Sequence, residues 1–196
     1  MPRLSETIMR YAERLPEGTP IVPKRLLHLG SRAAVDQALS RLARRGKLLR
    51  AGRGVYVSPV ETRFGSRAPA AEKVVEGVAQ QRGETVARHG AAAANALGLT
   101  PQVPTRTVYL TSGPSRELHL GRQVVQLKHA PRWQLALPEG LAGEAVRALA
   151  WLGPTKGREA LSSLKLTPSC REEMASVSAI LPPWMAEAVD EIAEYA

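Results

Sequence analysis

Apolar residues in the first part of the chain recur first at a helical spacing and then at a strand-like one. Residues 5–15 follow the helical pattern, beginning at Ser5, whose hydroxyl suits a helix N-cap. Ile21-Val22 has the pattern of a short strand, and a proline at the start of residues 23–28 suits the first turn of a brief helix. Gly30 then provides a tight turn. The pattern predicts a helix, a strand and a second helix in close succession.

A longer amphipathic helix is predicted next, from Ser31 as its N-cap to about Arg45. Gly46 suits the position directly after its end. Its apolar residues form one stripe: Ala34, Val35, Ala38, Leu39 and Leu42. Two short strands around the turn Gly52-Arg53-Gly54 read as a hairpin with a basic tip. This succession of elements is typical of a winged helix-turn-helix, predicted over residues 1–60.

The charge of the chain is concentrated at its beginning. The formal net charge is +9, from 27 Lys and Arg against 18 Asp and Glu. Residues 1–63 contain 13 basic and 5 acidic side chains, whereas residues 170–196 contain 1 basic and 6 acidic side chains. A basic front of this kind favours a polyanion as the partner of the predicted winged helix.

Composition also indicates where the chain works. Hydrophobic residues make up 44% of it, but no apolar run reaches the length of a membrane span, and the N-terminus lacks the apolar run of a signal peptide. The single cysteine, Cys170, excludes an internal disulfide and a cysteine-rich zinc site. We therefore expect a cytoplasmic protein that does not contact a membrane.

Candidate DNA contacts fall on the predicted recognition helix and wing. Residues 24–53 contain nine basic side chains and one acidic one, Asp36. Arg32, Gln37 and Arg41 are the predicted base readers, because Arg and Gln pair with guanine and adenine edges. Asp36 either accepts from cytosine or pairs with Arg32 one turn earlier. The full predicted DNA-binding set is Lys24, Arg25, Ser31, Arg32, Gln37, Ser40, Arg41, Arg44, Arg45, Lys47, Arg50 and Arg53. The alternative is a protein-interaction domain whose basic face is only solvated.

The remainder of the chain predicts a second, mixed domain. Residues 61–69 read as a linker, in which Arg63 and Arg67 are available as additional DNA-backbone contacts. Residues 70–196 read as an α+β domain with a small sheet and a helical C-terminal region. Its expected elements are a helix at 70–81, an alanine-rich segment at 87–97, strands at 105–112, 117–120 and 123–129, and helices at 141–152, 156–164, 169–180 and 183–195.

Two stretches of the sequence resemble the AbiEi-type antitoxins, which are transcriptional regulators of type IV toxin–antitoxin systems. The resemblance lies in Ser31-Arg32-Ala33-Ala34-Val35, in Leu42-Ala43-Arg44-Arg45-Gly46-Lys47-Leu48-Leu49-Arg50-Ala51-Gly52-Arg53-Gly54-Val55-Tyr56, and in the segments Arg88-His89-Gly90, Leu97-Gly98-Leu99 and Val108-Tyr109-Leu110-Thr111. It covers about two-thirds of the chain and weakens after Pro131. The resemblance implies an autorepressor that binds repeats in its own promoter as double-stranded DNA. It also implies that the rest of the chain opposes a nucleotidyltransferase-like toxin, with or without touching it.

The last predicted helix leaves two interpretations open. One side of this helix is an apolar stripe formed by Trp184, Met185, Ala188, Val189 and Ile192. Acidic residues occupy the other faces of the helix. The stripe either docks on the core of its own domain or serves as a partner surface. In the second case the C-terminal region would neutralise a toxin by direct contact.

Residues with catalytic potential do not form a recognisable enzyme motif. The four histidines lack metal-ligand spacing, although His119 and His129 fall on neighbouring predicted strands. A nuclease-like arrangement would use Glu84 and Glu117 with Lys128, but a glutamine replaces the usual acid before that lysine. We expect no cofactor, no metal and no enzymatic activity, with a metal-dependent nuclease as a distant alternative.

Overall fold

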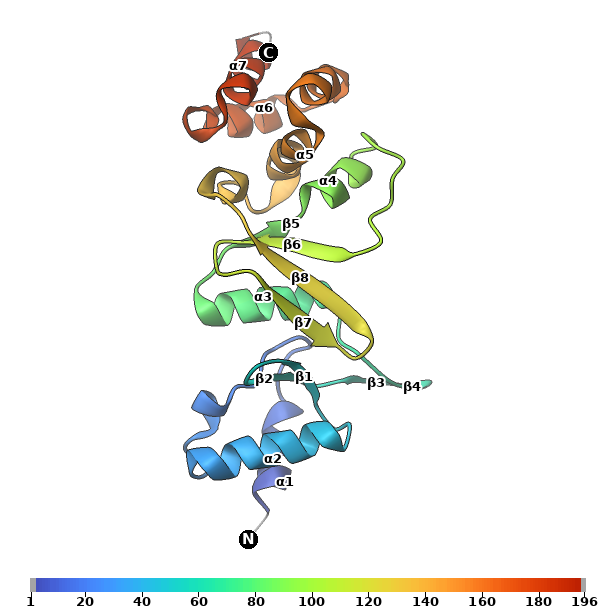
Figure 1. Ribbon diagram of the computed structural model, residues 1–196, viewed down its shortest axis with the longest axis vertical. Coiled ribbons are helices and arrows are strands. Elements are labelled where there is room, and N and C mark those ends of the chain that lie inside the picture. Colours follow the sequence, from blue (N-terminus) through green and yellow to red (C-terminus); the bar gives the residue numbers. More distant parts are fainter. Residues whose placement is uncertain (1–2, 195–196) are drawn as a thin grey trace. The chain divides into compact units, whose positions relative to one another are not determined.

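The structure is a computed structural model that describes residues 3–194 (Figure 1). It confirms the predicted α+β class, with seven α-helices and eight strands in the described part of the chain and a helical C-terminal region. The chain divides into two compact units. The first unit comprises the residues up to Glu84 together with Arg116–Gln126, and the second comprises Thr85–Ser115 together with the residues from Leu127 onward.

The first unit begins with the elements predicted for a winged helix. These are α1 (Leu4–Ala12), the 3-10 helix η1 (Pro23–Leu26), α2 (Arg32–Arg44) and the antiparallel strands β1 (Leu49–Gly52) and β2 (Val55–Val57). Ile21 forms an isolated antiparallel bridge with Tyr56 and thereby extends this small sheet. Apolar side chains from all of these helices meet beneath it, including the fully buried Ile8, Leu26 and Leu39. The order and packing are compatible with a winged helix-turn-helix.

Residues predicted as a linker form a second hairpin of the first unit. Strands β3 (Val60–Thr62) and β4 (Gly65–Arg67) pair antiparallel, and α3 (Ala71–Arg82) follows them. Helix α3 packs against the loop after α1 so closely that a Cβ at Gly18 would lie 2.6 Å from the backbone of Lys73. The division between compact units therefore comes at Glu84, later than the predicted domain boundary at residues 61–69.

Helix packing dominates the second unit. Its elements include β5 (Val86–Arg88), α4 (Gly90–Ala96), β6 (Thr107–Thr111), η2 (Arg132–Leu135), α5 (Gly140–Ser163), α6 (Pro168–Ala175), η3 (Ser178–Ile180) and α7 (Pro183–Glu194). Strand β7 (Arg116–Leu120) belongs to the first unit, and β8 (Gln123–His129) begins in the first unit and ends in the second. The strand order of the four-stranded sheet is β5-β6-β8-β7. Helix α5 bends at Gly153, whose φ of +80° is non-helical, so the two helices predicted on either side of this residue are both present.

The apolar stripe of α7 belongs to the core of its own unit. Met185 and Val189 are fully buried and pack in one cluster with Leu149 and Met174. The ring of Trp184 lies against Gly157, where a Cβ would come within 2.9 Å of it. The stripe therefore packs on its own unit, with Met185, Ala188 and Val189 buried and Trp184 and Ile192 partly buried against the same cluster. No helix among residues 3–194 is both long enough and apolar enough to cross a membrane.

Candidate nucleic-acid interface

Helix α2 presents one polar line opposite its buried stripe. The Oγ of Ser31 accepts a hydrogen bond from the backbone N–H of Ala34 at 3.3 Å, as predicted for the N-cap. Gly46, with a φ of +70°, follows the end of the helix. Val35, Ala38, Leu39 and Leu42 are buried against the unit. The helical repeat of about 3.6 residues then directs Ala33, Gln37 and Arg44 away from the core, with the half-buried Ser40 beside them.

An ion pair lies on one flank of this polar line. The Nε of Arg32 donates to Oδ2 of Asp36 at 2.8 Å, with 62% and 47% of the two side chains exposed. The structure therefore contains the pairing that was one of the two interpretations of Asp36. Exposed pairs one helical turn apart contribute only about 0.3–0.5 kcal/mol, so a phosphate can displace the aspartate at little cost.

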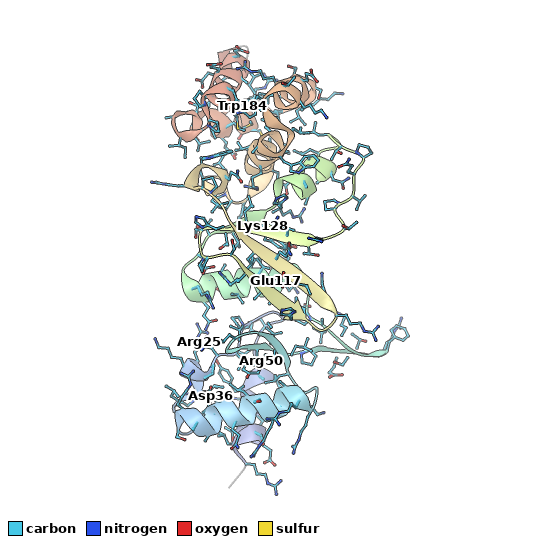
Figure 2. The ribbon with its side chains drawn as sticks, in the orientation of Figure 1. Arg25, Asp36, Arg50, Glu117, Lys128 and Trp184 are labelled. Atoms are coloured by element: carbon cyan, nitrogen blue, oxygen red, sulfur yellow. The ribbon has the colours of Figure 1, made fainter. Side chains whose placement is uncertain are left out.

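Four cationic side chains from three elements line one open pocket of the first unit. Its volume is about 580 Å³. We call it the cationic pocket, and the residues that line it are Val22, Pro23, Lys24, Arg25, Arg32, Arg53, Gly54 and Gln81. Lys24 and Arg25 come from η1, Arg32 from the first turn of α2 and Arg53 from the turn between β1 and β2. All four are exposed, and Arg25 is visible beside α2 in Figure 2. The arrangement concentrates positive charge at the N-terminal end of α2, where the helix dipole adds to it.

The other predicted contacts lie outside this pocket. Arg32 and Arg41 are nine residues apart, about two and a half turns, so they point to opposite flanks of α2 and do not share a site. Gln37 and Arg41 are neighbours one turn apart on the exposed surface. Ser40 is half-buried and accepts a hydrogen bond from Nη2 of Arg44 at 3.4 Å. The remaining members of the predicted set, Arg45, Lys47 and Arg50, are exposed, and Figure 2 marks Arg50 on β1.

Carboxylates of the nuclease-like arrangement are engaged with other side chains. Glu84 accepts two hydrogen bonds from the guanidinium of Arg116, at 3.1 and 2.5 Å, and both side chains are largely buried. Glu117 accepts a hydrogen bond from Nε2 of Gln126 at 3.1 Å. Within residues 3–194, no group of three or more His, Cys, Asp and Glu side chains is arranged to hold a metal.

Two histidines of the second unit have structural contacts. The Nδ1 of His89 accepts from the backbone N–H of Ala91 at 3.2 Å and so caps α4. Burial, together with the nearby charge of Lys128, lowers the pKa of His89. The Nδ1 of His129 lies 3.0 Å from the carbonyl oxygen of Gly113. Neither arrangement resembles a catalytic pair.

Arg147 is a structural residue that the sequence pattern does not reveal. It lies on α5, is 2% exposed, and its Nη1 and Nη2 donate to the carbonyl oxygens of Leu137 and Pro138 at 2.7 and 3.2 Å. Burial lowers the pKa of Arg147 to about 10, and the carboxylate of Glu144 partly opposes that shift. The guanidinium therefore satisfies backbone carbonyl groups in the segment before α5, and it is too buried to belong to a basic surface. Nothing in the sequence marks this role, because Glu144 at helical spacing makes Arg147 resemble a member of an ordinary surface ion pair.

Comparison with known proteins identifies one family. Residues 7–168, most of the chain, match DUF6088, which is described as a family of unknown function. A search of curated proteins gives no match, and a search of solved structures gives none. The match begins within α1 and covers the elements from η1 to β2, the cationic pocket and the whole four-stranded sheet. The chain belongs to the DUF6088 family.

Proposed function

We propose that the chain is a sequence-specific DNA-binding transcriptional regulator that represses its own operon and acts as the antitoxin of a type IV toxin–antitoxin system. The single observation that carries the DNA-binding part is the cationic pocket. Its cations come from η1 (Lys24 and Arg25), from the start of the recognition helix α2 (Arg32) and from the turn of the wing (Arg53). Asp36 is the nearby acid on α2. Four converging cations attract the anionic phosphates of DNA more strongly than they attract a neutral protein surface.

The geometry of α2 supports a division of roles along the helix. Gln37 and Arg41 are the base readers of this proposal, since both are exposed; Gln37 lies opposite the buried stripe, and Arg41 follows one turn later on a flank of α2. Arg32 moves from the base-reading group to the phosphate-binding group because it lines the cationic pocket. Phosphate contacts fix the register of the helix in the groove, and base contacts supply the specificity.

The antitoxin part of the proposal depends on the resemblance to AbiEi-type proteins. Repression of the operon limits the amount of toxin without any contact between the two proteins. We do not favour direct neutralisation through α7, because Met185 and Val189 are buried in the core of their own unit. What α7 leaves exposed is acidic, and Glu187 there is already paired with Arg158 at 2.7 Å.

The experiment is a binding titration of the full chain on a fluorescent duplex taken from upstream of its own reading frame. Binding that survives a large excess of random-sequence duplex supports the proposal, and equal affinity for every duplex contradicts its sequence-specific part. The double variant Arg32→Gln, Arg53→Gln removes two cations of the pocket. If both contact phosphates, the slope of log K against log salt falls by about 2.

A matched control separates local contacts from net charge. The double variant Lys156→Gln, Lys165→Gln removes the same charge from exposed positions of the second unit. We expect its affinity to change little and its salt slope to equal that of the wild-type chain. The antitoxin role is tested by expressing the chain with a nucleotidyltransferase-like protein encoded beside it. Rescue of growth supports the role, and growth arrest despite full expression of the chain contradicts it.

A further inference from the structure

The β3–β4 hairpin presents an aromatic ring to solvent. Phe64, the single phenylalanine of the sequence, lies at the turn between the strands and is 86% exposed. The Cζ of Arg63 lies 4.6 Å from the centroid of this ring, within the range of a cation–π contact. Figure 1 shows β3 and β4 extending away from α1 and α2 of the same unit. Among the large hydrophobic side chains of the described residues, this ring is the most exposed.

The hairpin is held in a defined conformation at its base. The Oε1 of Glu17 accepts from Nη1 of Arg67 at 3.2 Å and from the backbone N–H of Ala70 at 3.0 Å. Its Oε2 accepts from Nζ of Lys73 at 2.6 Å. These contacts lower the pKa of Glu17 to about 2, with the bond to Lys73 as the largest cause. They tie β4 and the start of α3 to the loop after α1.

Hydrogen bonds at the tip order the turn itself. The hydroxyl of Thr62 donates to the carbonyl oxygen of Gly65 at 2.7 Å and accepts from the backbone N–H of Phe64 at 3.2 Å. Gly65 has a φ of +108°, a conformation that L side chains rarely adopt. The exposed ring is therefore presented on a preorganised turn, which reduces the entropy lost when it binds.

From this arrangement, and resting on the DNA-binding role proposed above, we infer that Phe64 is a wedge that inserts between base steps of the duplex from the minor groove. Proteins that bend DNA use apolar wedges of this kind, and base stacking on an aromatic ring is independent of sequence. Arg63 then contacts an adjacent phosphate, while the recognition helix reads a neighbouring part of the same duplex. The hairpin is thus a second DNA contact of the first compact unit.

Charge favours DNA over a protein as the occupant of the ring. A protein groove that buried Phe64 would also have to desolvate the guanidinium of Arg63 beside it, which is costly without a paired acid. Duplex DNA offers a base stack for the ring and phosphates for the guanidinium at adjacent positions. Duplex DNA can therefore accommodate both Phe64 and Arg63 at once.

The test compares wild type, Phe64→Ala and Phe64→Leu on a 40-bp duplex from the upstream region, labelled at its two ends for energy transfer. Val103→Ala, which truncates another exposed apolar residue (74% exposed) in the second unit, is the matched control. We expect wild type and Val103→Ala to bend the duplex alike. Phe64→Ala is expected to lose the bend and about tenfold in affinity, and Phe64→Leu to keep part of both.

Three results would overturn the inference. In the first, Phe64→Ala binds and bends the duplex as wild type does. In the second, Phe64→Ala keeps DNA binding but loses self-association in sedimentation, which would assign the ring to a contact between two copies of the chain. In the third, Phe64→Ala keeps DNA binding and self-association but no longer binds a protein partner. Failure of the wild-type chain to bind any duplex would instead remove the proposed function, so the two failures are distinguishable.

Discussion

The guanidinium of Arg32 is held 2.8 Å from the carboxylate of Asp36 at the edge of the cationic pocket. Under the proposed DNA-binding role, the aspartate would compete with a DNA phosphate for the same cation. Asp36→Asn should therefore raise affinity for all duplexes by a few-fold, because it removes a negative charge and frees Arg32. Titrations of a random-sequence duplex at several salt concentrations measure this. A loss of discrimination at one G·C position, with unchanged affinity for random DNA, would instead assign Asp36 to cytosine recognition.

Gln37 provides the sharpest test of base reading on α2. Gln37→Ala should lower affinity for the preferred duplex by about 1–3 kcal/mol and leave affinity for random duplexes nearly unchanged. Gln80→Ala, which removes an exposed glutamine from α3, should leave both affinities as they are. Equal losses on preferred and random duplexes after Gln37→Ala would mean that this side chain contacts only the backbone.

Glu17 makes the anchoring of the β3–β4 hairpin dependent on pH. Its pKa is lowered from 4.5 to about 2 in the folded chain, so its contribution to stability is fully present above pH 4.5 and is lost as the pH falls toward 2. Glu17→Gln should lower Tm at pH 6 and approach the wild-type Tm near pH 2. Thermal unfolding followed by circular dichroism across this range measures the effect, with Glu13→Gln as an exposed control. A constant difference in Tm at every pH would contradict the prediction.

Arg147 should stabilise the second unit more than any exposed cation does. Arg147→Met keeps the side-chain volume but leaves the carbonyl oxygens of Leu137 and Pro138 without their donors, at an expected cost of about 2–3 kcal/mol. Arg158→Met breaks only an exposed pair with Glu187 and should cost under about 1 kcal/mol. Urea unfolding of both variants gives the comparison. Equal stability of the two would show that burial of Arg147 contributes nothing.

Local signals made the first part of the fold predictable. Ser31 and Gly46 mark the ends of α2 because an N-cap hydroxyl and a left-handed glycine are needed there, and both are found at these positions. The apolar stripe of α2 is buried as expected from its spacing. The predicted DNA-binding residues are exposed except for Ser40, which is half-buried. Whether they bind DNA stays a prediction.

Elements fixed by contacts distant in sequence were not predictable. The β3–β4 hairpin has too few apolar residues to resemble a strand pair, and its position depends on Glu17, which lies 50 residues before Arg67. Strand β5 has only three residues and is hidden in an alanine-rich segment that suggests a helix. Its neighbour α4 requires glycine at position 90, because a Cβ there would overlap the carbonyl oxygen of Arg147.

The central claim is that this chain recognises a particular DNA sequence through α2. The most direct measurement is selection of bound duplexes from a randomised library by the full chain, in parallel with the double variant Gln37→Ala, Arg41→Ala. The account predicts one recurring motif for the wild-type chain, bound at least about 1,000-fold more tightly than a scrambled duplex, and no motif for the variant. Recovery of no motif by the wild-type chain, with equal affinity for every duplex, would contradict it.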